Sequence, residues 1–222
     1  AISANTAQAA LAAVKAAKAA GLVVSCDLNF RKKLWNWRPG TTPQALAQET
    51  MRGILPFVDV VIGNEEDAEK VLGIKAAGSN VVAGALNVQA YEQVARKIVD
   101  QFPNVGKVAI TLRGSHSATH NSWGAMLFDR ATDQTYLAPH ADGTYTPYEI
   151  QAIVDRVGGG DSFAAGLIFA LLTDSLHEPH TALRFATAAS CLKHAIPGDI
   201  NYATREEVEA LMRGDASGRV SR

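Results

Sequence analysis

The segment of this sequence best suited to chemistry is Gly158-Gly159-Gly160-Asp161. Glycine adopts backbone conformations with φ > 0 and lets a ligand approach the main chain closely. The apolar run from Ala164 to Leu172 predicts a buried helix, which places Asp161 at its start. Unpaired N–H groups and the positive end of the helix dipole can hold a phosphate there. Such donors beside a carboxylate that can deprotonate an alcohol favour phosphoryl transfer, although an aspartate here can also be a simple helix cap.

Polar side chains also follow three segments that are predicted to be strands. They are Asp27, Asn29 and Arg31 after the first, Gly63 to Asp67 after the second, and Thr111 to Gly114 after the third. Ligands of parallel α/β sheets bind at the carboxyl ends of strands, so these residues are candidates for a site. An extended chain would turn Asp27, Asn29 and Arg31 the same way. A guanidinium suits a carboxylate or a phosphate, but Arg31 with two lysines can also be a solvated surface cluster.

The segment 155–166, DRVGGGDSFAAG, resembles the C-terminal signature D-x-x-G-A-G-D-x-F-x-x-G of the pfkB (ribokinase-like) sugar kinases. This sequence has Gly159 where the family more often has alanine, and both residues are small. The resemblance implies that Asp161 is the catalytic base and that Gly158, Gly159 and Gly160 form the anion hole for the transferred phosphoryl group. The segments DLNFRKKLWNW and KHAIPGD are similar to the 2-keto-3-deoxygluconate kinase branch of that family.

The resemblance also implies a nucleotide and metal site. Asn64 and Asp67 match the family's N-x-x-E element, which orders Mg²⁺ beside the phosphates. Asp67 replaces the glutamate, so Glu66 or a water compensates for the shorter reach, and Asp67 and Glu66 are the metal candidates. An N-cap followed by acidic residues explains the same segment without a metal. Thr111 and Arg113 correspond to the nucleotide loop, with Arg113 where glycine is usual.

For the substrate, the resemblance implies that Arg31, with Asn29 beside it, contacts a sugar acid carboxylate or the nucleotide phosphates. Asp161 would take the proton of the substrate hydroxyl, and Asp199 would make a polar contact to the substrate or to the glycine loop. The implied reaction is ATP-dependent phosphorylation with Mg²⁺, and 2-keto-3-deoxygluconate, converted to its 6-phosphate, is the first choice of substrate.

Helices and strands that could position these residues alternate along the chain, which predicts an α/β fold with a mainly parallel sheet covered on both faces. The expected helices are Asn5 or Thr6 to Ala20, Thr42-Pro43 to Leu55, Glu65–Leu72, Val88–Phe102, the Asp161 helix, Pro179–His194 and Arg205–Met212. The expected strands are Leu22–Asp27 (buried), Val58–Ile62, Val105–Leu112 and a hairpin of Ala125–Asp129 with Thr135–Leu137. The resemblance implies a three-layer α/β/α ribokinase-like arrangement.

The 222 residues predict one domain over 1–213 and a disordered tail over 214–222. The resemblance covers the C-terminal two-thirds of the family pattern, so the N-terminal strands and the lid are expected to be absent. A homo-oligomer would use that lid. Without it, this chain alone is expected to bind sugar weakly and turn over poorly.

Composition limits the kinds of partner and the cellular location that are expected. A formal net charge of -1 without a basic run argues against nucleic acid. No apolar run is long enough for a bilayer, and Cys26 and Cys191 do not suggest disulfides, so a cytoplasmic protein is expected. The six histidines show no metal-binding spacing such as HExxH, and no zinc site is predicted.

Other functions stay open at this point. Fructokinases and ribokinases share the glycine loop and the base, so another sugar of the family is an alternative substrate. A dinucleotide-dependent dehydrogenase is a weaker alternative, because no strand with an acidic residue follows the glycines by about twenty positions. A catalytically incompetent fragment that acts as a binding or structural module is the third.

Overall fold

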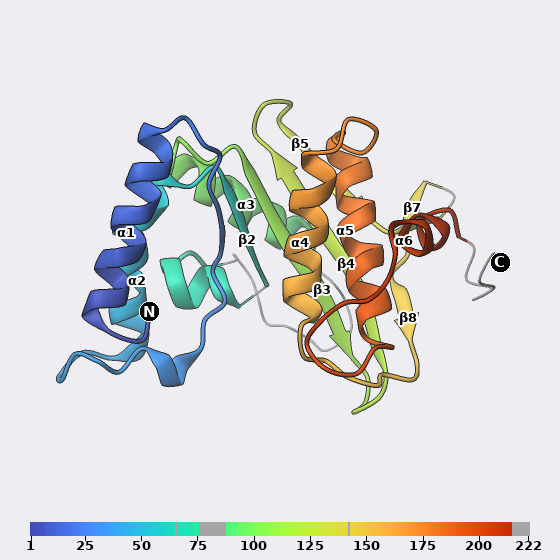
Figure 1. Cartoon of the computed structure of the whole chain (residues 1–222), viewed down its shortest axis with the longest axis horizontal. Coiled ribbons are helices and arrows are strands. Elements are labelled where there is room, and N and C mark those ends of the chain that lie inside the picture. The colour runs from blue at the N-terminus through green and yellow to red at the C-terminus, as the bar shows by residue number, and fades with distance from the viewer. Residues whose placement is uncertain (65, 76–87, 142, 215–222) are drawn as a thin grey trace. The chain divides into compact units, whose positions relative to one another are not determined.

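The computed structural model describes residues 1–64, 66–75, 88–141 and 143–214 (Figure 1). The chain divides into two compact units. Unit 1 is Ala1–Ile110 with Phe128–Thr135, and unit 2 is Thr111–Leu127 with Tyr136–Arg222. The single domain of residues 1–213 stays a prediction. The expected disordered tail lies outside the described residues, apart from Gly214. No helix in the described part of the chain is both long and apolar enough to cross a membrane.

Unit 1 alternates helices with short strands. Its elements are α1 (Ala4–Ala19), β1 (Ser25–Asp27), η1 (Lys32–Leu34), α2 (Pro43–Ile54), η2 (Leu55–Phe57), β2 (Val60–Asn64), η3 (Ala68–Leu72) and α3 (Val88–Gln101). The α2 prediction is confirmed, because the Thr42 side chain accepts a hydrogen bond from the amide of Ala45, with Pro43 in the first turn. The predicted α3 is also confirmed, with Val94, Ile98 and Val99 buried.

Three expectations for unit 1 were wrong in detail. The N-cap of α1 is Ser3, in a capping box with Thr6, and not Asn5 or Thr6. The strand predicted from Leu22 starts only at Ser25, because the Leu22 amide donates to the Ala17 carbonyl and extends the end of α1. Leu22 is therefore 57% exposed instead of buried. The helix predicted over Glu65–Leu72 is a π-helical turn over Ala68–Leu72, and Glu65 lies outside the described residues.

Strands β3 (Lys107–Ser115) and β4 (Asn121–Asp129) continue from one unit into the other. The remaining elements are β5 (Gln134–Ala138), β6 (His140–Ala141), β7 (Thr144–Tyr145), β8 (Tyr148–Ile150), α4 (Gly159–Leu171), α5 (Pro179–Lys193) and α6 (Arg205–Met212). The larger sheet has the order β1-β2-β3-β4-β5, and β8 also pairs with β4. It is parallel between β1 and β2 but antiparallel between β4 and β8, so the sheet is mixed.

Helices α4 and α5 lie side by side in unit 2 and pack closely (Figure 1). Phe163, Leu167 and Leu183 are completely buried. At Gly166 the helices approach so closely that an added Cβ would lie 3.1 Å from the Ala186 α-carbon. This packing fixes the start of α4, where the glycine loop ends, relative to the end of α5.

Replacement of Gly166 by leucine should therefore force the two helices apart. We expect it to lower the free energy of unfolding by about 1–3 kcal/mol, the usual cost of overpacking a close-packed core. Urea denaturation would measure the change. Ala165→Leu, one residue earlier on the exposed side of α4, is the matched control and should change stability by less than about 0.5 kcal/mol. Equal effects of the two substitutions would contradict the proposed close contact.

Candidate functional site

The start of α4 leaves main-chain N–H groups open. The N-cap is Gly158, with φ 79°, and it has no side chain to cap the helix. Among the described residues, the amides of Gly160 and Asp161 have no hydrogen-bond partner, while the Ser162 amide donates to the Gly158 carbonyl. The side chain of Asp161 is exposed in this same turn. Asp161 is thus not the helix cap, and an exposed carboxylate lies beside two unpaired donors.

Asp155 holds the glycine loop against the KHAIPGD segment. One of its carboxylate oxygens accepts from the Val157 amide (2.9 Å) and the other from the Gly198 amide (2.8 Å). These two donors lower the pKa of the Asp155 carboxyl below its ordinary value. A Cβ added to Gly158 would overlap the carbonyl oxygen of Asp199, so only glycine fits there. The main chain of Asp199 therefore contacts the glycine loop. Its side chain is exposed, and the polar contact expected of that side chain stays a prediction.

His194 explains why glycine stands at position 159. A Cβ there would lie 3.2 Å from the His194 ring. That ring is almost fully buried, lies with its centroid 4.8 Å from that of the tilted Trp123 ring and makes a 2.8 Å hydrogen bond through Nδ1 to the Ser190 carbonyl. Burial lowers the pKa of His194, which favours the neutral imidazole. The Ser190 hydroxyl donates to the Gly159 carbonyl (2.7 Å), so α5 supports the loop directly.

Strand β3 carries the two predicted nucleotide residues. Thr111 is buried and Arg113 is exposed on the same strand of unit 2. The hairpin that follows is held by Arg156, whose guanidinium donates to the carbonyls of Ser117 (3.1 Å) and Ala118 (2.7 Å). Arg156 lies in a variable position of the signature, so the sequence offered no sign of this contact.

In unit 1, Asp67 joins the ends of β1 and β2. The carboxylate is buried, and its oxygens accept from the amides of Phe30 (2.9 Å) and Asn64 (3.0 Å). Each oxygen keeps a second lone pair. Glu66 is exposed and forms an ion pair with Lys70. The segments predicted to bind substrate and metal thus lie next to each other in this unit.

Asn29 positions Arg31. The Asn29 side-chain oxygen accepts from the Arg31 Nε at 3.3 Å, and Asn29 has φ 32°. The expectation that an extended chain aligns Asp27, Asn29 and Arg31 was wrong, because β1 ends at Asp27 and the chain turns at Asn29. Within the described residues the two terminal nitrogens of Arg31 have no partner, so this exposed fork can meet an anion.

Comparisons with known proteins bear on the family and the fold of this chain. A family model described as pfkB family carbohydrate kinase matches residues 1–205. A 2-dehydro-3-deoxygalactonokinase of Haloferax volcanii is 25% identical over 206 residues, which are 92% of this chain and 52% of that protein. The crystal structure of 2-dehydro-3-deoxygluconokinase from Thermotoga maritima is 42% identical with a TM-score of 0.76, over 91% of this chain and 53% of that one.

A solved structure of lower sequence identity supports the fold only. The structure of a fructokinase with bound ATP from Xylella fastidiosa is 20% identical with a TM-score of 0.61, over 95% of this chain and 57% of that chain. Together with the closer matches, it confirms the predicted ribokinase-like α/β fold class. The chain spans about half the length of the relatives it matches.

The contacts of Asp155 predict a pH-dependent stability. The folded-state pKa is below the ordinary value of 3.8, so ionised Asp155 stabilises the fold above that pH, and this contribution is lost as the pH falls through the lowered pKa. Asp155→Asn should therefore reduce the free energy of unfolding at neutral pH. Its difference from the unmodified protein should shrink as the pH drops below about 3.8.

Urea denaturation at a series of pH values would measure this difference. Asp174→Asn, at an exposed position of the same unit, is the control and should change stability little at any pH. A deficit of Asp155→Asn that does not change with pH would show that the carboxylate charge is not what holds the loop.

Proposed function

This chain belongs to the pfkB family of carbohydrate kinases, and from this we propose that it is part of an ATP-dependent kinase for a 2-keto-3-deoxy sugar acid. The two relatives described above are named for kinases of such acids, 2-dehydro-3-deoxygluconate and its galactonate counterpart. The greater identity to the gluconokinase favours 2-keto-3-deoxygluconate as the substrate and its 6-phosphate as the product.

The observation that carries the proposal is the exposed carboxylate of Asp161 beside the amides of Gly160 and Asp161, which have no partner in the described part of the chain. Asp161 takes the proton of the sugar hydroxyl as the hydroxyl oxygen forms its bond to phosphorus. The bond from phosphorus to the departing ADP oxygen then breaks. The amides donate to the phosphoryl oxygens, where negative charge is concentrated, at the positive end of α4.

The unpaired amides fit a nucleotide phosphate, because a helix start with free N–H groups binds anions. Thr111 and Arg113 are proposed to contact the phosphates, and the positive charge of Arg113 suits this role. Asp67 and Glu66 are proposed to hold Mg²⁺, with the Asn64 side-chain oxygen, which accepts from the amides of both, fixing the turn before them. Hard carboxylate oxygens suit this ion, and Asp67 keeps a free lone pair on each oxygen. Bound Mg²⁺ would neutralise phosphate charge.

Arg31 is proposed to bind the sugar acid carboxylate. Its two terminal nitrogens are unpaired among the described residues, and Asn29 fixes the Nε, so the fork is oriented before the substrate arrives. A bidentate contact to a carboxylate is a strong, charge-assisted interaction. Asn29 and Asp199 are proposed to make further polar contacts to the substrate.

Asp161→Asn should slow catalysis strongly while leaving nucleotide binding intact, because asparagine keeps the shape of the side chain but cannot accept the proton. We expect kcat to fall by roughly 10²–10⁴-fold or more. A coupled ADP-release assay on the full-length protein with 2-keto-3-deoxygluconate, together with nucleotide titration, would measure both properties. Asp174→Asn serves as the control with normal turnover, and near-normal turnover of Asp161→Asn would rule out the assigned base.

Arg31→Ala tests whether Arg31 binds the carboxylate of a sugar acid substrate. Loss of charged hydrogen bonds costs about 1.5–3 kcal/mol, so KM for the sugar acid should rise about 10- to 150-fold. KM for a neutral sugar such as fructose, if it is turned over, should not change. Arg52→Ala, at another exposed position of unit 1, is the matched control. An equal loss for acidic and neutral sugars would assign Arg31 to the nucleotide or to the fold.

A further inference from the structure

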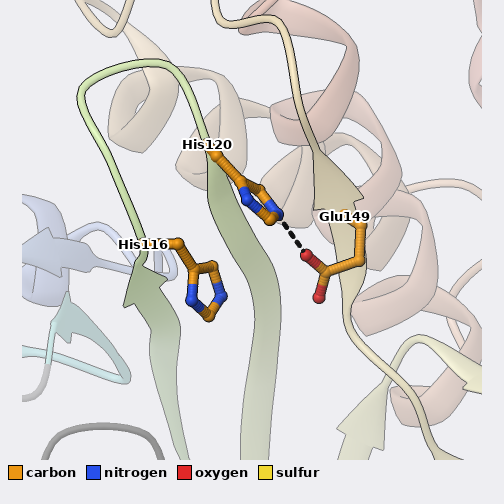
Figure 2. Close-up of side chains that lie close together, drawn as sticks. All are labelled: His116, His120 and Glu149. Carbon is orange, nitrogen blue, oxygen red and sulfur yellow. Dashed lines mark hydrogen bonds and ion pairs between the residues drawn. The ribbon is translucent and has the colours of Figure 1, made fainter.

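Three side chains of types that bind metal ions lie close together in unit 2. They are His116, directly after β3, His120, directly before β4, and Glu149 of β8, and Figure 2 shows them on three neighbouring segments. One ligand atom from each lies within 4.8 Å of the other two. None of the three belongs to the proposed kinase site.

The main chain fixes this arrangement. The amides of His116 and Ser117 both donate to the His120 carbonyl at 3.0 Å, which closes the hairpin and brings the two histidines together. Strand β8 pairs with β4 so that Glu149 lies opposite Ser122. Residues two apart on a strand share a face, so His120 is on the same face as Ser122 and diagonally across from Glu149.

The side chains already contact one another. The His120 Nε2 is 2.7 Å from a Glu149 oxygen (Figure 2). The His116 Nε2 is 3.1 Å from the Ser122 hydroxyl, and the two imidazole rings lie 4.6 Å apart between centroids. The hairpin itself is anchored by Arg156, which donates to the carbonyls of its turn. The two imidazoles and the carboxylate therefore need little reorganisation to face a common point.

The three ligand atoms lie near the spacing that a small ion requires. Zn²⁺ binds imidazole nitrogen and carboxylate oxygen at about 2.0–2.2 Å, so two ligands of one tetrahedral ion are about 3.4 Å apart. The three atoms lie within 4.8 Å of one another, and His116 and Glu149 are exposed, so their side chains can move closer together. Two imidazoles favour Zn²⁺ and similar transition metals over Mg²⁺, which prefers oxygen ligands.

We propose that His116, His120 and Glu149 form a binding site for a divalent transition-metal ion, with Zn²⁺ as the favoured ion. Three protein ligands leave a fourth position for water or another small ligand. Binding replaces the hydrogen bond between His120 and Glu149, with any proton on the ligating nitrogen moving to the other ring nitrogen or to water, and joins β8 to the β3–β4 hairpin. The site does not depend on the proposed kinase function. Known motifs do not reveal the site, because Ser117 stands where HExxH has glutamate and the third residue, Glu149, lies far away in the sequence.

Isothermal titration of the chelator-treated chain with ZnCl₂ tests the site directly. We expect one Zn²⁺ per chain and a melting temperature that rises with Zn²⁺ concentration, since the ion binds only the folded state. His116→Ala and Glu149→Gln should each weaken binding by at least about 10- to 100-fold, because even the outer partners of a zinc site contribute that much. Both variants should lose the Zn²⁺-dependent rise in melting temperature.

His177→Ala is the matched control, because it removes an exposed histidine of the same unit outside the cluster and should bind Zn²⁺ like the unmodified chain. The melting temperature of each variant without metal shows whether the substitution itself destabilises the fold. If it does, His120→Asn is used in place of that variant. Failure of the unmodified chain to bind Zn²⁺ would overturn the proposal. Unchanged affinity in either His116→Ala or Glu149→Gln would do the same.

Discussion

The contact between Gly158 and the main chain of Asp199 determines how α4 begins. An N-cap residue usually satisfies the second or third amide of the helix with its side-chain oxygen. Here the carbonyl of Asp199 occupies the space that a Cβ would need, and the positive φ of Gly158 excludes most other residues. The helix therefore starts without a side-chain cap, and the amides of Gly160 and Asp161 stay available for a ligand.

The surrounding side chains support this turn without using those amides. Ser190 donates to the carbonyl of Gly159, and Asn201 donates to the hydroxyl of Ser162. Asp155 binds the amide of Val157, which precedes the helix. Asp155, α5 and the loop after α5 thus hold the turn from both sides and keep it rigid, while the amides of Gly160 and Asp161 stay unpaired among the described residues. A rigid set of open donors needs no rearrangement when charge arrives, and this is the main physical requirement for stabilising a phosphoryl group.

The sequence predicted what depends on local structure. The pfkB family and the fold class are confirmed, as is α2, which follows from the adjacent cap and proline of Thr42-Pro43. Contacts between distant segments could not be read from the sequence. The role of Asp155 depends on Gly198, and the glycine at 159 depends on His194. Each pair is separated by more than thirty residues, so only the packing of α4 on α5 reveals it.

The histidine cluster shows why a spacing has meaning only together with a secondary structure. A separation of four residues places two histidines on one face of a helix, and zinc motifs such as HExxH depend on this. His116 and His120 have the same separation but flank a tight turn between two strands, where the hydrogen bonds of the hairpin bring them together. The third residue, Glu149, comes from a strand paired with β4. The register of the sheet, and not a sequence motif, therefore creates this site.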